Sequence, residues 1–233
     1  MIYIMSDLHG DFQNFYKMLI KINFSHSDIM YILGDILDKN SENMRLYEFI
    51  REQSNIFLIK GNHEYSCERY LEGKISAQTW EIYGGYYTIQ EVEKLEPESR
   101  KRLCEYLKGL PFYTSLKVNG TEYFLTHSGI RAGCCVEKED GVIDIQASVD
   151  MAVKESQESY LISDDINYMS DSLRFDKKVI VGHYPTLLLP DCYGSAKIYY
   201  GKNYINIDTG NDRREEGGRM ACLRLDDGKE YYI

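Results

Sequence analysis

Five short segments of this 233-residue chain carry residue types that bind metal ions, and each segment follows a short apolar run. Four of the five histidines lie in these segments, beside several Asp residues and an Asn. The segments are residues 7–10, 34–38, 61–64, 126–129 and 181–183. Because the carboxyl ends of strands in an open α/β sheet line one crevice, apolar runs that form strands would bring the segments together. Mixed oxygen and imidazole donors favour Mn, Fe or Zn over Mg or Ca.

The donor types indicate a site for two divalent ions that share a carboxylate. Two cations about 3.5 to 4 Å apart need a bridging ligand, and Asp35 is our candidate. We expect one ion to bind Asp7, His9 and Asp35, and the second to bind Asp35, Asn62, His127 and His183. Since two cations lower the pKa of a bridging water, a metal-bridging hydroxide would be the nucleophile at neutral pH. His26 stands outside the segments, and we interpret it as an exposed turn residue.

His63 adjoins a predicted ligand and suits another role. Hydrolysis of an ester needs a general acid opposite the nucleophile to protonate the leaving oxygen. An imidazole oriented and charged by a nearby carboxylate can serve as that acid, and we assign the carboxylate to Asp38. His63 and Asp38 are therefore the predicted catalytic pair.

Alternation of apolar runs with amphipathic stretches predicts the elements that position these residues. Strands at 2–5, 29–33 and 56–59 alternate with helices at 12–20 and 44–50, which is the pattern of a layered or doubly wound α/β domain. Further helices are expected at 64–72, around 80 and at 97–108. Strands at 113–118 and 122–126, joined by Asn119-Gly120, predict a hairpin and a second sheet, with more strands at 179–181, 204–207, 220–225 and 231–233. We expect one domain over residues 1–233.

Charge, hydrophobicity and cysteine content argue against several classes of protein. The formal net charge of −10 repels a phosphate backbone, so we expect no nucleic-acid partner. No stretch approaches the roughly 18 apolar residues of a membrane span, and the N-terminal sequence lacks the features of a signal peptide, which favours a cytoplasmic protein without a membrane partner. The six scattered cysteines, including Cys134 and Cys135, form no CxxC pair, and we interpret them as reduced structural thiols.

The ordered set of motifs resembles the calcineurin-like metallophosphoesterases. Within that family it is similar to the PPP-type serine/threonine protein phosphatases, in particular their phage and bacterial branch, and to diadenosine tetraphosphatases. Many phosphodiesterases of the family carry a second histidine after Gly182-His183, and this chain has Tyr184-Pro185 there. The resemblance implies an α/β (α+β) fold with a central β-sandwich flanked by helices, in place of a simple doubly wound sheet. It also implies a dinuclear centre, for which Mn is favoured and Fe or Zn are alternatives.

Departures from the family pattern bear on phosphate binding. Lys39-Asn40 replaces the usual Arg-Gly after Asp38, and a lysine cannot make the bidentate fork of a guanidinium. Lys60 stands where an arginine commonly precedes Gly-Asn-His-Glu, and Ser163 occupies the region of a third arginine, for which Arg174 is a remote substitute. We expect Lys39, Asn62 and His63 to bind the substrate phosphate, with lower affinity than a protein that has the arginines.

The favoured function is a phosphoric monoester hydrolase acting on protein phosphoserine or phosphothreonine. A small phosphate ester is also a candidate partner, and hydrolysis of a dinucleoside polyphosphate is the second enzymatic hypothesis. Its support is an excess of tyrosines, clustered at Tyr83, Tyr86 and Tyr87 and at Tyr199, Tyr200 and Tyr204, which are either a rim for a base or half-buried packing. A third hypothesis is a weakly active or non-catalytic binding protein on the same fold.

Overall fold

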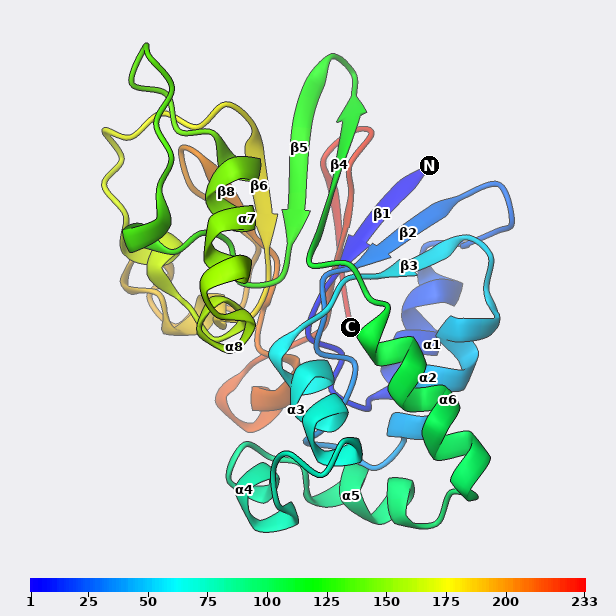
Figure 1. Cartoon of the computed structure of the whole chain (residues 1–233). Helices are drawn as coiled ribbons and strands as arrows, with labels where there is room; N and C mark the ends of the chain where they lie inside the picture. The colour runs from blue at the N-terminus through cyan, green and yellow to red at the C-terminus, as the bar shows by residue number, and fades with distance from the viewer.

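The computed structural model describes residues 1–233 and contains two five-stranded mixed sheets packed face to face, with helices outside both (Figure 1). The first sheet has the order β10-β9-β1-β2-β3, and the second has the order β4-β5-β6-β8-β7. The strands are β1 (Ile2–Met5), β2 (Ile29–Ile32), β3 (Ile56–Leu58), β4 (Tyr113–Val118), β5 (Thr121–Thr126), β6 (Lys178–Val181), β7 (Tyr199–Tyr200), β8 (Tyr204–Asn206), β9 (Ala221–Arg224) and β10 (Lys229–Tyr232). The β-sandwich implied by the resemblance is therefore confirmed.

Side-chain alternation along the strands separates the inner and outer faces of the sandwich. In β1, Ile4 points into the layer between the sheets, whereas Tyr3 and Met5 join the cluster beneath the outer helices. In β6, Ile180 lies between the sheets and Val179 faces the opposite helices. Strands buried on both faces need apolar residues at every position, which explains their continuous apolar runs.

Helices cover the first sheet, and the sequence patterns predict each of them except the one at 86–93. The helices of this side are α1 (Phe12–Lys21), α2 (Asn43–Glu52), α3 (Asn62–Leu71), α4 (Ala77–Ile82), α5 (Tyr86–Glu93) and α6 (Pro97–Lys108). In α1 the buried face includes Phe15 and Met18, and the Asp11 side chain caps the N-terminus by accepting from the Asn14 amide at 3.2 Å. Pro97 begins α6, where its missing amide donor costs nothing.

The second sheet is covered by α7 (Ile145–Glu155) and α8 (Gln157–Leu161) (Figure 1). The predicted hairpin forms between β4 and β5, and its two turn residues, Asn119 and Gly120, both have positive φ. This geometry matches the twist of the paired strands and explains the Asn-Gly sequence. No helix combines the length and the apolar character needed to cross a membrane.

Candidate metal centre

The five predicted segments all follow strands whose carboxyl ends meet at one edge of the sandwich. They follow β1, β2, β3, β5 and β6. The turns there are tight. Nine non-glycine residues have a left-handed φ; five of them are in these segments, namely Asp7, His9, Asp35, Asp38 and His183, and a sixth, Lys39, directly follows one. Such backbone conformations are costly for residues with side chains and concentrate at functional sites.

Four donor atoms converge on the side of the second sheet. Nε2 of His127 lies 3.1 Å from Nδ1 of His183, and Oδ1 of Asn62 lies 2.8 Å and 3.0 Å from these two nitrogens. Oδ2 of Asp35 lies 3.3 Å from Nε2 of His127. The structure thus brings together all four residues predicted to bind the second ion. Donor lone pairs that face one another across about one ion diameter are the arrangement of a transition-metal site.

Backbone carbonyls hold these imidazoles with one ring nitrogen toward the cluster. Nδ1 of His127 donates to the Leu33 carbonyl at 2.6 Å, which leaves Nε2 as the free donor atom. Burial, with the neighbouring His127, lowers the pKa of His183 to about 3, so that its imidazole is neutral. A neutral imidazole whose far nitrogen is fixed by a carbonyl is oriented as a metal ligand.

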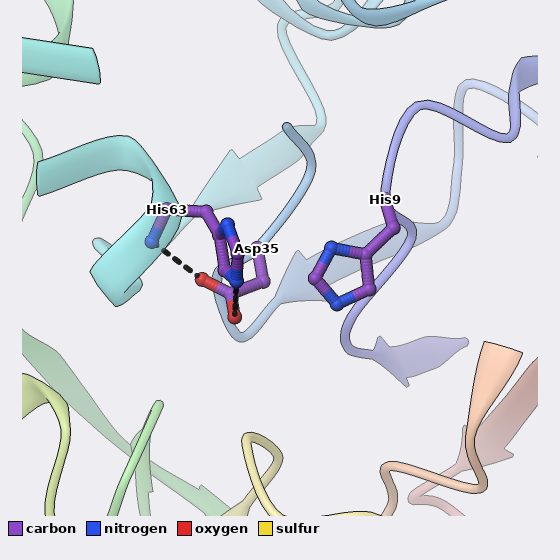
Figure 2. A group of neighbouring side chains, drawn as sticks. All are labelled: His9, Asp35 and His63. Atoms are coloured by element: carbon purple, nitrogen blue, oxygen red, sulfur yellow. Dashed lines mark hydrogen bonds and ion pairs between the residues drawn. The ribbon is translucent and has the colours of Figure 1, made fainter. Parts of the chain in front are cut away.

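A second cluster contains His9, Asp35 and His63, whose donor atoms lie within 4.8 Å of one another (Figure 2). Nδ1 of His9 donates to the Leu37 carbonyl at 3.0 Å, so Nε2 faces the cluster. Oδ1 of Asp7 lies 4.0 Å from this Nε2, which places Asp7 beside the cluster. Asp35 belongs to both groups, as expected of a bridging ligand.

Three buried carboxyl groups, those of Asp7, Asp35 and Asp208, lie in or near the two clusters. Burial and the charges of Asp208 and Asp35 raise the pKa of Asp7 well above its usual range. Burial also raises the pKa of Asp208 to about 7. Burial disfavours ionised Asp35 as well, but the charges of His127 and His63 outweigh it and hold the pKa of Asp35 well below its usual range. Bound cations would stabilise these carboxylates, so the donor set fits divalent metal ions.

His63 is paired with Asp38 as predicted. Nδ1 of His63 donates to Oδ2 of Asp38 at 2.6 Å, and Nε2 lies 3.8 Å from Oδ2 of Asp35. Asp38 is fully buried and also accepts hydrogen bonds from Nε1 of Trp80, at 2.8 Å, and from the Thr88 hydroxyl. Although burial alone lowers the pKa of His63, Asp35 and Asp38 outweigh it and raise that pKa to about 9.

Sequence reasoning gave no role to Glu64, which organises the segment around Asp35. The Glu64 carboxylate accepts hydrogen bonds from the backbone amides of Asp35, Ile36 and Gly61 at 2.7 to 2.9 Å. Glu64 is the third residue of α3, which is the position of the Glu in a capping box. This spacing is the one feature of the sequence from which a role for Glu64 could have been predicted. The support of Asp38 by Trp80 and Thr88 had no comparable local signal.

The four residues considered for phosphate binding, or standing where an arginine is usual, lie in different environments. Lys39 is exposed beside Asp38. Lys60 is buried and donates to Glu68 at 2.8 Å, so its ammonium is committed within the fold. Arg174 donates to the Asp140 carbonyl, and the Ser163 hydroxyl accepts from the Asp165 amide at 3.3 Å. Of these residues, Lys39 is the one that adjoins the His63–Asp38 pair, and its ammonium forms no ion pair.

Comparisons with known proteins agree with this geometry. A family model described as calcineurin-like phosphoesterase matches residues 1–213. Serine/threonine-protein phosphatase 2 of Salmonella typhimurium is 25% identical over 128 residues, which cover 54% of this chain and 57% of that protein. The symmetrical bis(5′-nucleosyl)-tetraphosphatase of Haemophilus ducreyi is 36% identical over 134 residues, covering 55% of this chain and 44% of that protein. The matches thus cover about half the length of these relatives.

The fold also matches solved structures. A protein serine/threonine phosphatase from Saccharomyces cerevisiae superposes with a TM-score of 0.58 at 14% identity, covering 100% of this chain and 78% of the other. At this identity the likeness concerns the fold alone. Together with the family match over most of the sequence, it establishes that this chain belongs to the calcineurin-like phosphoesterases, hydrolases that use a dinuclear metal centre.

Proposed function

We propose that this chain hydrolyses phosphomonoesters at a two-metal site, with His63 as the general acid. The observation that carries the proposal is the position of the His63–Asp38 pair beside the two donor clusters that share Asp35. A protein that only binds metal has no need of a buried imidazole–carboxylate pair at this point. The pair therefore favours catalysis over the non-catalytic alternative.

The proposed ligands follow the two clusters. One ion would bind Asp7, His9 and Asp35, and the other would bind Asp35, Asn62, His127 and His183. Divalent ions, when bound, neutralise the phosphate charge and lower the pKa of an attacking water. The mixed carboxylate and imidazole donors support Mn, with Fe and Zn as alternatives.

His63 delivers a proton to the leaving oxygen. Asp38 occupies Nδ1, so Nε2 is the nitrogen that faces the clusters and the substrate. The Asp38 carboxylate on Nδ1 favours the protonated imidazole, which is the form that a general acid needs. Transfer of that proton from Nε2 to the ester oxygen, as the P–O bond breaks, releases a neutral alcohol instead of an alkoxide.

Lys39, Asn62 and His63 are the proposed phosphate-binding residues. Lys39 supplies a single point charge where a guanidinium would supply two parallel donors. Each hydrogen bond to a charged group is worth about 1.5 to 3 kcal/mol, so we expect a higher Michaelis constant than in a protein with an arginine at this position.

Two substrate classes are supported. Protein phosphoserine or phosphothreonine is supported by the similarity to the Salmonella phosphatase. A dinucleoside tetraphosphate is supported by the 36% identity to the Haemophilus enzyme. Product analysis separates the classes, because phosphopeptides release inorganic phosphate and diadenosine tetraphosphate releases adenine nucleotides.

The test is hydrolysis of p-nitrophenyl phosphate in excess Mn²⁺ by the wild type and by His63→Asn, with bis-p-nitrophenyl phosphate as the diester comparison. We expect monoester turnover to exceed diester turnover. We expect His63→Asn to lose about 10²- to 10⁴-fold in kcat on an alkyl phosphate, whose leaving group needs protonation, and less on p-nitrophenyl phosphate. Metal binding without any turnover would favour the non-catalytic alternative. Equal turnover of the alkyl phosphate by the wild type and His63→Asn would remove His63 from the mechanism.

A further inference from the structure

Three exposed tyrosines surround the turn between α4 and α5. Tyr83 ends α4, Tyr86 and Tyr87 begin α5, and the exposed fractions of the three residues are 55%, 51% and 43%. The rings of Tyr86 and Tyr87 meet edge to face, with centroids 5.2 Å apart. By contrast, Tyr204 is buried and packs against Tyr199, so two members of the second tyrosine cluster contribute to the core, whereas Tyr200 is 50% exposed. The first cluster, which we call the tyrosine rim, has no such packing role.

The turn beneath the tyrosine rim touches the proposed phosphate-binding residue. The Lys39 amide donates to the Gly84 carbonyl at 3.1 Å. A Cβ atom on Gly84 would lie 2.7 to 2.9 Å from the last two carbons and the ammonium of Lys39, so the lysine stem crosses directly over this turn. Gly84 has a φ of +99°, a conformation that favours glycine.

The same turn is tied to the proposed general acid. The Trp80 indole packs against Gly85 so closely that a Cβ atom there would lie 2.5 Å from the ring. Nε1 of that indole donates to Asp38, which holds His63. The α4–α5 pair, which lies below α3 in Figure 1, is therefore tied to Lys39 and, through Trp80, to the carboxylate that holds His63. Because Lys39 is a proposed phosphate-binding residue, a group attached to the phosphate would lie near this turn.

We propose that Tyr83, Tyr86 and Tyr87 form a subsite that stacks on a planar ring in the leaving group, either a nucleobase or an aryl group. The inference rests on the proposed function for the location of the leaving group. Tyrosines offer flat, rigid surfaces at low entropic cost, and stacking on an aromatic side chain stabilises a base without requiring a specific hydrogen-bond pattern. Substrates with a ring would then bind more tightly than ring-free esters of equal charge.

The test compares matched ligands in the Mn²⁺-loaded full chain carrying His63→Asn, in which we expect turnover to be slow. Isothermal titration measures AMP against ribose 5-phosphate, and phosphotyrosine against phosphoserine. Stacking of about 1 to 3 kcal/mol per ring corresponds to roughly 5- to 150-fold tighter binding of the ring-bearing ligand. Adding Tyr86→Ala and Tyr87→Ala should reduce that ratio to near one, while leaving the affinity for ribose 5-phosphate unchanged.

Tyr16→Ala is the matched control, because Tyr16 is equally exposed at 50% but lies on α1. It should retain the ring preference. If Tyr86→Ala and Tyr87→Ala abolish only the preference for AMP over ribose 5-phosphate, the subsite binds a nucleobase. If they abolish only the preference for phosphotyrosine over phosphoserine, it binds an aryl group. Equal affinities of the ring-bearing and ring-free ligands before the tyrosines are removed, or a preference that survives their removal, would overturn the proposal. The ratio is read from binding, so absence of p-nitrophenyl phosphate turnover in the wild type would count against the proposed function alone.

Discussion

Replacing Thr88 by Val tests the support of the His63–Asp38 pair. The Thr88 hydroxyl donates to one oxygen of Asp38 and accepts from the Asp38 amide at 3.1 Å, and both residues are fully buried. Val has nearly the same shape as Thr but lacks both functions. The substitution therefore removes one donor to a buried carboxylate and leaves a buried amide without a partner.

The expected cost follows from these two losses. A hydrogen bond to a charged group contributes about 1.5 to 3 kcal/mol, and an unpaired buried amide costs about 1 to 3 kcal/mol. Because the losses share one hydroxyl, we expect Thr88→Val to lower the free energy of unfolding by about 2 to 4 kcal/mol rather than by their full sum. For a chain of this size, about 2 to 4 °C per kcal/mol predicts a fall of about 4 to 16 °C in Tm.

Thermal unfolding of Thr88→Val beside Thr88→Ser provides the assay, since Ser keeps the hydroxyl. We expect Thr88→Ser to retain most of the stability. Asp38 orients His63, so Thr88→Val should also lower kcat more for an alkyl phosphate, which needs protonation of its leaving group, than for p-nitrophenyl phosphate. An unchanged Tm in Thr88→Val, or equal losses in the Val and Ser variants, would refute the role given to this hydroxyl.

Three further perturbations probe the surroundings of the site. Lys39→Arg should lower the Michaelis constant for p-nitrophenyl phosphate, and an unchanged or higher value would place Lys39 outside the phosphate pocket. Glu68→Gln should lower the free energy of unfolding, measured in urea, by about 3 to 5 kcal/mol, because it leaves the buried Lys60 ammonium unpaired. The double variant Lys60→Met/Glu68→Leu should lower it less, because it leaves no buried charge without a partner. Gly61→Ala should reduce metal content, measured by mass spectrometry, because its Cβ would lie 2.1 Å from Oδ1 of Asp35, while Gly133→Ala, with open space around it, should not.

Local patterns were sufficient to predict most of the fold. The apolar runs before residues 7, 35 and 61 form parallel strands, and the helices between them follow the apolar spacing of α1 and α2. Asn119-Gly120 fixed the hairpin through turn geometry alone. These features depend on neighbouring residues, which is why the sequence reveals them without an account of tertiary packing.

The supports of the site could not be predicted in the same way. Trp80 and Thr88 donate hydrogen bonds to Asp38, which lies 42 and 50 residues away in the sequence. Glu64 accepts hydrogen bonds from backbone amides 28 and 29 residues earlier. Such contacts exist only after α3, α4 and α5 have packed over the strand ends. Lys60 is a similar case. Its place before Gly-Asn-His-Glu in the sequence does not indicate that its side chain is buried and paired with Glu68.

The most direct test of the two-metal centre is the metal content of the purified chain after equilibration with Mn²⁺ and removal of free metal. Asp35 is shared by both donor clusters, so we expect two ions per wild-type chain and none in a folded Asp35→Asn variant. Circular dichroism establishes that the variant is folded. Two ions retained by Asp35→Asn, or a wild type that binds a single ion at saturation, would contradict a centre bridged by this carboxylate.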